Sequence, residues 1–230
     1  MTDNPTVAQL LVQDLPPGFV RQILETLPKI YREAYDSVTN DNRLGEPEAL
    51  YLLGHTRRAL FETKFRKMAQ SCGMQVEMHK PKRGGCTHVR ALVGRFQLIT
   101  CHVASPGAFP NHSDCREQYS AINEHIQQGQ LFAEDSSPEE QALYGILTHT
   151  SDPKDASTFR SAQIGFPDTR FLEWTEEPVD LLDIRDKQSR MFRGAEDLQG
   201  QIQRPKPRWK QAQQQEPKPI FKKNKLGDND

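Results

Sequence analysis

Apolar and polar residues alternate between positions 87 and 103, on both sides of a Gly-Arg pair. A period of two is typical of a strand with one buried face. Gly94 can adopt the positive φ that a type II′ turn requires at its first position, so the pattern predicts an antiparallel hairpin of residues 87–93 and 96–103. On the expected core face, this turn pairs Val93 with Phe96, Ala91 with Leu98, and Val89 with Thr100.

A third alternating run, residues 74–80, precedes the hairpin. Its apolar members Val76 and Met78 are expected to join the core face. Residues 81–85, with one proline and two glycines, connect this run to the hairpin. The three runs together predict an antiparallel meander. The face of this meander opposite the core is expected to carry Glu77, His79, His88, Arg90, Gln97 and Cys101.

Two segments with apolar residues at steps of three and four predict long helices before the meander. The first covers residues 19–38, and Pro28 within it should kink the helix or start a second one. The second covers residues 47–71, with Gly73 placed to cap its C-terminus. Its expected inner stripe is Leu50, Leu53, Leu60, Phe61, Phe65 and Met68, and its expected basic outer surface is Arg57, Arg58, Lys64, Arg66 and Lys67.

The region after the hairpin predicts one more helix and two more strands. Ser113 can cap a helix over residues 114–128. Residues 142–149 and 160–166 are rich in β-formers and should pair antiparallel across a polar loop. The predicted fold class is therefore α+β, with a mainly antiparallel sheet of about five strands packed with N-terminal helices. We expect residues 1–186 to form this single domain.

Residues 187–230 differ from the rest of the chain in charge and composition. They hold eleven Lys/Arg against five Asp/Glu, whereas residues 1–186 hold nineteen against twenty-six. Four prolines and many glutamines leave few apolar residues to offset the entropy cost of ordering. We therefore expect a basic tail that is largely disordered when free. Large apolar residues stand isolated in it at Trp209, Ile220 and Phe221.

Catalytic patterns on the polar face of the meander are incomplete. A metal-dependent nuclease of the restriction type needs an Asp, and an Asp/Glu-x-Lys on a neighbouring strand, whereas Glu77-x-His79-Lys80 has its lysine one residue too far along. Cross-strand pairing would bring His88 next to Cys101, and a Cys–His pair can act as an activated nucleophile. The alternative hypothesis is therefore a nucleic-acid-processing enzyme that uses Glu77, His79, His88, Arg90 and Cys101.

Cysteine spacing and hydropathy indicate whether a cofactor is expected and in which cell compartment the protein is expected. The four cysteines lack the Cys-x-x-Cys spacing of structural zinc sites, so we expect free thiols, no metal and no cofactor. No segment has the composition of a signal peptide or the length to span a bilayer. The expectation is a cytoplasmic protein without membrane contact.

Binding is the function that the sequence favours. An acidic body with a basic, proline-spaced tail has the layout of antitoxins that wrap a toxic partner with a disordered segment. The expected partner is a protein, contacted through Trp209, Ile220, Phe221, Arg204, Lys206, Arg208 and Lys210. Nucleic acid is the alternative partner, and it would be contacted through Lys80, Lys82, Arg83, Arg90 and Arg95.

Overall fold

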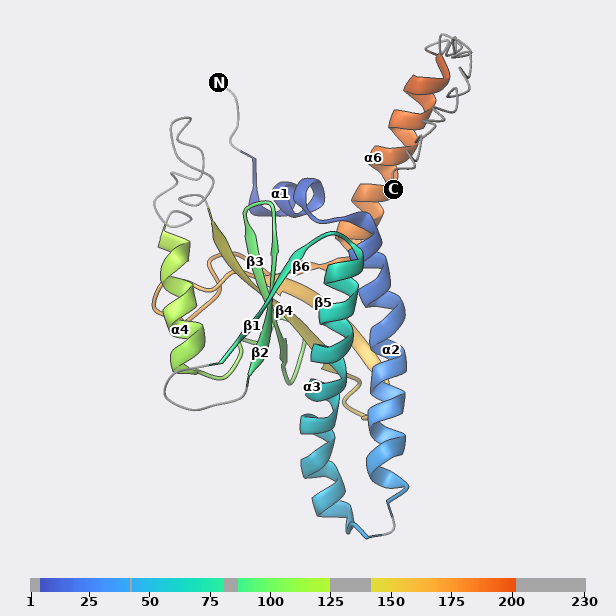
Figure 1. Ribbon diagram of the computed structural model, residues 1–230, viewed down its shortest axis with the longest axis vertical. Coiled ribbons are helices and arrows are strands. Elements are labelled where there is room, and N and C mark those ends of the chain that lie inside the picture. Colours follow the sequence, from blue (N-terminus) through green and yellow to red (C-terminus); the bar gives the residue numbers. More distant parts are fainter. Residues whose placement is uncertain (1–4, 42, 81–86, 125–141, 202–230) are drawn as a thin grey trace, which may run out of the picture. The chain divides into compact units, whose positions relative to one another are not determined.

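The computed structural model describes residues 5–41, 43–80, 87–124 and 142–201. At the centre of this part of the chain lies a six-stranded sheet in the order β1-β2-β3-β4-β5-β6 (Figure 1). The strands are β1 (Gln75–His79), β2 (His88–Val93), β3 (Phe96–His102), β4 (Leu143–Ser151), β5 (Phe159–Gly165) and β6 (Val179–Asp180). Neighbouring strands are antiparallel except β3 and β4, which run parallel.

Helices cover both faces of the sheet. The helices α1 (Val7–Asp14), α2 (Pro17–Thr39) and α3 (Glu46–Ser71) lie on one face, and α4 (Asp114–Ser120) with the 3-10 turn η1 (Ala121–Asn123) lies on the other (Figure 1). A last helix, α6 (Leu181–Gln201), follows β6. This arrangement confirms the predicted α+β class, with six strands in place of about five.

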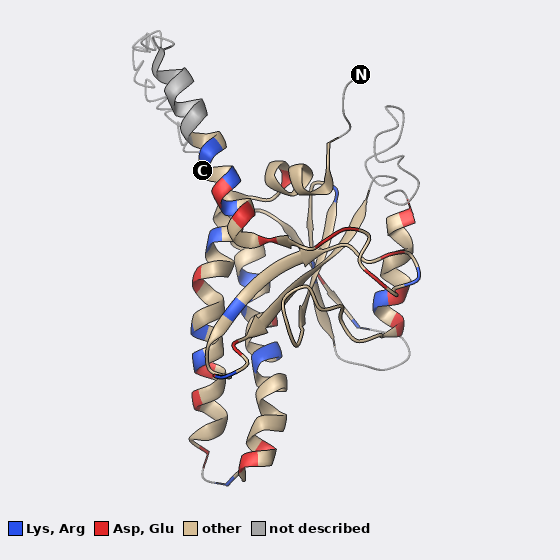
Figure 2. Ribbon diagram, turned by 180° about the vertical axis from the view of Figure 1, so that it is seen from behind, with Lys and Arg blue, Asp and Glu red and all other residues tan. Residues whose placement is uncertain are grey.

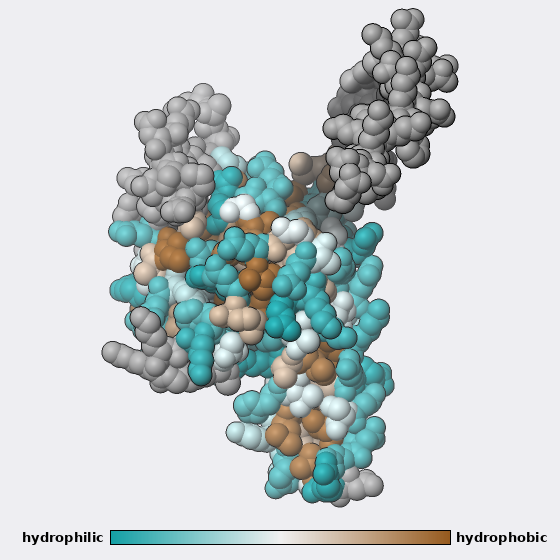
Figure 3. Space-filling view, in the orientation of Figure 1, coloured by the Kyte–Doolittle hydropathy of each residue, from teal (hydrophilic) through white to brown (hydrophobic). Residues whose placement is uncertain are grey.

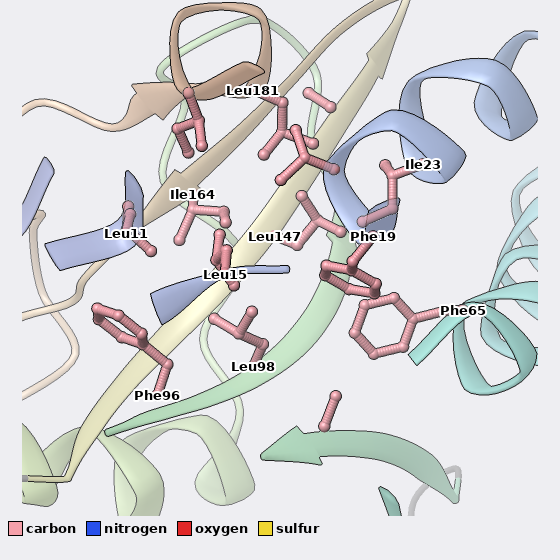
Figure 4. Close-up of a cluster of buried hydrophobic side chains, with 14 of the residues drawn as sticks. Leu11, Leu15, Phe19, Ile23, Phe65, Phe96, Leu98, Leu147, Ile164 and Leu181 are labelled. Atoms are coloured by element: carbon pink, nitrogen blue, oxygen red, sulfur yellow. The ribbon is translucent and has the colours of Figure 1, made fainter. Parts of the chain in front are cut away.

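The larger core fills the space between the sheet and the N-terminal helices. Phe19 and Phe65, from α2 and α3, meet edge to face with ring centroids 5.7 Å apart, and they lie beside Leu98 and Leu147 of the sheet (Figure 4). All four side chains are fully buried. Burying a side chain of this size stabilises the fold by roughly 1.5–3 kcal/mol. This core holds α2 and α3 in fixed positions against the sheet.

The predicted hairpin is confirmed. Gly94 has a φ of 52°, and the β2–β3 ladder pairs Val93 with Phe96 and Ala91 with Leu98. β1 completes the predicted meander by pairing antiparallel with β2. Two details of the core face are wrong: the ladder ends at Ala91, so Val89 does not pair with Thr100, and Met78 is 53% exposed. Met78 lies on the edge strand, where the helices leave it open to solvent.

Both predicted N-terminal helices form, α2 as one helix and not as two. α2 continues through Pro28, because the burial of Leu27, Ile30 and Tyr31 on either side outweighs the roughly 3 kcal/mol cost of a proline inside a helix. In α3 the expected faces are wrong at two positions. Leu50 of the inner stripe is 55% exposed, and Arg57 of the outer surface is only 5% exposed.

The second half of the sheet contains both predicted strands. β4 and β5 pair antiparallel, with His149 opposite Ala162. The helix predicted over residues 114–128 begins as expected, since the Ser113 hydroxyl accepts a hydrogen bond from the Arg116 N–H, but α4 ends at Ser120. Residues 125–128 lie outside the described part of the chain. The parallel contact of β3 with β4 was not predicted.

The last helix includes the position where the basic tail was expected to begin. The chain divides into two compact units, residues 1–193 and 194–230. α6 runs across the predicted boundary after residue 186, so residues 187–201 are helical. Gln188 is 3% exposed and donates hydrogen bonds to the carbonyls of Val12 and Leu15. The residues expected to contact a partner lie beyond Gln201, outside the described residues: Arg204, Lys206, Arg208, Trp209, Lys210, Ile220 and Phe221.

Hydropathy along the helices sets one further limit. Within the described ranges, none of the helices combines the length and the apolar composition that a bilayer crossing needs.

Candidate functional site

The polar face of the meander contains an ion pair at its centre. The Arg90 Nε donates to the Glu77 Oε2 at 3.1 Å and its Nη2 contacts the same oxygen, while its Nη1 donates to the Gln97 Oε1 at 3.2 Å. The guanidinium lies 5.4 Å from the ring centroid of Tyr119 in α4. Glu77 and Arg90 face each other across the strands because their positions are paired in the β1–β2 ladder. Both charges are thus engaged within the fold.

Two histidines and a tyrosine extend this face toward the end of β1. His79 and His88 are paired across the ladder, with ring centroids 5.2 Å apart. Tyr119 contacts both rings, at 5.4 Å from His79 and 5.8 Å from His88. His88 is only 9% exposed, and its Nε2 lies 3.7 Å from the Cys115 Sγ. The structure therefore brings together Glu77, His79, His88 and Arg90, as predicted.

Cys101 does not join this group through His88. The Cys101 Sγ instead accepts a hydrogen bond from the Arg116 Nη2 at 3.2 Å, and burial raises the pKa of its thiol. The predicted His88–Cys101 contact needed a β2–β3 ladder that continued past Ala91, and this ladder ends there. The thiol next to His88 is that of Cys115, which α4 supplies. The helix was predicted from its Ser113 cap, but strand alternation could not show that it packs on this face of the meander.

Glu62 of α3 occupies the place where β2 and β3 separate. Its Oε2 accepts the Val89 backbone N–H at 2.7 Å, and its Oε1 accepts the Thr100 hydroxyl at 3.0 Å. Burial raises the pKa of this carboxyl against the lowering effect of the two hydrogen bonds. Glu62 thus replaces the backbone pairing that was predicted between Val89 and Thr100.

A buried polar cluster, missed in the sequence, joins α2 and α3 to the middle of the sheet. The Tyr31 hydroxyl and the His149 Nδ1 share a hydrogen bond of 2.8 Å, and the Arg57 guanidinium lies 4.6 Å from the Tyr31 ring centroid. Arg57 also donates to the carbonyl of Ala156. Phe61 stacks edge to face on His149 with centroids 4.7 Å apart. Burial lowers the pKa of His149 to about 3, and it raises the pKa of Tyr31.

Sequence did carry a signal for this cluster. Residues 143–150 are all buried, although Thr148, His149 and Thr150 are polar. A strand between two others and covered on both faces buries every side chain, so a polar residue within it needs a partner inside the protein. The partners of His149 come from α2 and α3, more than eighty residues earlier in the chain.

The free end of the α2–α3 hairpin exposes a group of apolar side chains. Leu50, Tyr51 and Leu52 are 55%, 72% and 37% exposed. Tyr51 and Leu52 also line an open hollow of about 460 Å³ together with Leu44, Pro47 and Glu48. Glu46 and Glu48, in the first turn of α3, add negative charge. We call this surface the hairpin tip and define it as Leu44, Glu46, Pro47, Glu48, Leu50, Tyr51 and Leu52.

The residues proposed for nucleic-acid contact are dispersed. Arg90 is paired with Glu77, and the Arg95 Nε lies 2.9 Å from the Asp14 Oδ2 in an ion pair with α1. Lys80 is exposed after β1. The remaining two, Lys82 and Arg83, lie outside the described residues. Arg90 and Arg95 are thus committed to internal carboxylates and have little free charge to offer a phosphate backbone.

In residues 5–41, 43–80, 87–124 and 142–201, no three His, Cys, Asp or Glu side chains are arranged to hold a metal ion. Cys72, Cys101 and Cys115 are free thiols. Comparison with protein-family models, with curated proteins and with solved structures gives no match to this chain.

Proposed function

We propose that the protein is a non-enzymatic binding protein that docks a macromolecular partner through its basic C-terminal segment, in the manner of an antitoxin. The observation that carries this proposal is the separation of charge and of apolar anchors along the chain. Residues 202–230 hold eight Lys/Arg against three Asp/Glu, with isolated large apolar residues between them. Such a segment gains affinity from charge and specificity from a few buried anchors. The partner that fits is a protein with an acidic surface and apolar hollows.

The internal pairing on the polar face supports binding over catalysis. A general base or a metal ligand must keep an open coordination or hydrogen-bonding position for substrate. Here Arg90 pairs with Glu77, Tyr119 of α4 contacts both histidine rings, and the Cys115 thiol of α4 lies 3.7 Å from the Nε2 of His88. The face therefore acts as a packed interface between the meander and α4. Its polar groups contribute to a unique alignment of those elements.

The tail hypothesis predicts a loss of partner affinity on single substitutions. Truncating Trp209 to Ala should weaken partner binding by about 2 kcal/mol, or roughly thirtyfold. The substitution removes the aromatic side chain that fills a hollow on the partner. The double change Ile220→Ala with Phe221→Ala should cost at least as much. The measurement is the dissociation constant of the complex with the copurified partner, at low and at moderate salt. Gln213→Ala serves as the matched control and should leave affinity unchanged.

The salt dependence of the affinity distinguishes anchored binding from binding by charge alone. Binding by charge alone falls steeply with salt and is insensitive to Trp209→Ala. An affinity that survives the three anchor substitutions, or that survives deletion of residues 202–230, would contradict the proposal.

The enzyme alternative makes a different prediction at His88. If binding is the function, His88→Gln should leave the partner affinity within about twofold, because His88 lies on the packed side of the meander and far along the chain from the tail. A nuclease assay on single- and double-stranded DNA and RNA, run with the same variant, provides the second readout. Nucleolytic activity in the wild type that His88→Gln abolishes would favour the enzyme.

A further inference from the structure

We propose that the hairpin tip, together with Gly54 and Arg58, is a homodimer interface at which two copies of this chain pack their α3 helices antiparallel. The interface involves the first three turns of α3, and the tail-mediated binding proposed above does not require it. The second copy uses the same surface and is related to the first by a two-fold axis, so every contact occurs twice. The hairpin tip thereby acquires a partner without any other protein.

One apolar stripe runs along α3 from its first turn to its last, but only the second half of this stripe is buried. Its members follow the helical spacing and therefore share one face of the helix: Pro47, Leu50, Tyr51, Gly54, Phe61, Phe65 and Met68. From Phe61 onward the stripe is buried in the core against the sheet, whereas Leu50 and Tyr51 are 55% and 72% exposed. Figure 3 shows hydrophobic surface at the free end of the hairpin, beyond the level of the sheet. A second helix beside these first turns would continue the burial that the sheet provides further along.

Gly54 lies on the exposed part of this stripe, inside a helix, where glycine costs roughly 1 kcal/mol relative to alanine. It is not among the glycines with a positive φ, and a Cβ added at this position would meet nothing within 4 Å. Within the described part of the chain, neither the backbone conformation nor crowding therefore requires a glycine here. A helix of a second copy that crosses at Gly54 can approach to the short end of the roughly 8–10 Å range of interaxial distances, because no side chain separates the two backbones.

Charge is distributed along these turns so that the surface complements itself. Figure 2 shows Asp and Glu positions at the free end of the hairpin, and Glu46 and Glu48 lie in the first turn of α3. Arg58, about three turns further along, is exposed, and its Nη2 lies 3.5 Å from the Thr87 carbonyl, at the limit of a hydrogen bond. An antiparallel pair places the acidic first turn of each copy opposite Arg58 of the other. A parallel pair would place like charges together, so the charges select the antiparallel arrangement.

The position of the sheet limits how far two copies can overlap. The stripe enters the core at Phe61, so a second helix has room only beside the turns before it. A two-fold axis at the level of Leu52 satisfies this limit, and it places Leu50 beside Gly54 of the second copy. The overlap is then residues 46–58, about 20 Å of helix at 1.5 Å per residue. An interface of this length lies near the lower limit for specific association, roughly 1,000 Å² in total, so we expect a dissociation constant on the order of 10 μM.

Sedimentation velocity of the full chain, at concentrations from about tenfold below to about tenfold above this value, tests the proposal. We expect a monomer–dimer equilibrium in the wild type. Leu50→Ser with Tyr51→Ser should raise the dissociation constant roughly tenfold or more, because it removes the apolar side chains that the second copy buries. Both side chains are exposed, so the fold should persist, and far-UV circular dichroism checks this. Leu172→Ser is the matched control and should leave the equilibrium unchanged, because Leu172 is 64% exposed and lies outside the hairpin.

Charge reversal provides a second, independent test in the same full chain. Arg58→Glu alone should weaken the dimer roughly tenfold, because it places a carboxylate opposite Glu46 and Glu48 of the second copy. Adding Glu46→Lys and Glu48→Lys reverses both members of each pair and should restore the wild-type dissociation constant. A wild type that stays monomeric over the whole concentration range, a dimer that survives the double serine substitution, or a triple variant no tighter than Arg58→Glu would each overturn the proposal.

Discussion

Between pH 7 and pH 5 the free energy of unfolding should fall by about 2 kcal/mol more in the wild type than in His149→Gln. His149 is fully buried, and burial lowers its pKa to about 3. In the unfolded chain the same imidazole titrates near 6.5. Below that pH the His149 imidazole binds a proton in the unfolded state but not in the folded state. Stability from the neutral, buried histidine is therefore complete above about pH 6.5 and is lost as the pH falls toward 3.

His149→Gln is the informative variant because its amide can still bond to the Tyr31 hydroxyl while it cannot be protonated in this range. Urea titrations of both proteins at pH 7 and pH 5 give the difference directly. His55→Gln, at an exposed position of α3, should keep the wild-type pH dependence. Identical pH profiles for the wild type and His149→Gln would contradict the assignment of a neutral, buried imidazole.

Local sequence patterns were sufficient for the elements that local interactions determine. The β2–β3 hairpin follows from one glycine and an alternating pattern, since the type II′ turn sets the register of the pairs next to it. The start of α4 follows from the Ser113 cap. In each case the sequence signal lies within a few residues of the turn or helix start that it predicts.

The parallel contact of β3 and β4 could not be predicted in the same way. Forty residues separate His102 from Leu143, so no turn fixes their relative direction. Antiparallel pairing across the sheet was the default expectation. The placement of α4 on the polar face depends on this crossover. Because α4 lies on this face, the thiol next to His88 is that of Cys115 in α4. Cys101 of the neighbouring strand instead accepts a hydrogen bond from Arg116 of α4.

The burial of a charged residue in the core was the other feature that the sequence pattern did not predict. Arg57 was assigned to a solvated helix face because arginine is rarely buried. Its guanidinium is accommodated by the Tyr31 ring and by the Ala156 carbonyl, ninety-nine positions along the chain. The opposite error at Leu50 has a geometric cause. The first turns of α3 extend past the sheet (Figure 1). They therefore bury only the side that packs on α2, with Ala49 and Leu53, and Leu50 stays exposed.

The largest loss of stability is expected at Asn123. Asn123→Ala should lower the free energy of unfolding by about 4 kcal/mol, because it leaves three buried backbone groups without partners. The Asn123 side chain accepts the Tyr144 N–H at 2.7 Å and donates to the carbonyls of Tyr144 and Pro167 at 2.9 and 2.8 Å. Asn123 is fully buried. It therefore joins η1 to the first part of β4 and to the loop after β5.

Asn123→Asp separates the hydrogen bonds from the shape of the side chain. The aspartate has nearly the same volume and can still accept the Tyr144 N–H, but it places a carboxylate against two carbonyl oxygens. We expect Asn123→Asp to be at least as destabilised as Asn123→Ala at pH 7, and to recover in part when the carboxyl is protonated at low pH. Urea denaturation at both pH values gives the comparison, with exposed Asn111→Ala as the control. A cost below about 1 kcal/mol for Asn123→Ala would contradict the three-bond role, because one net hydrogen bond alone contributes that much.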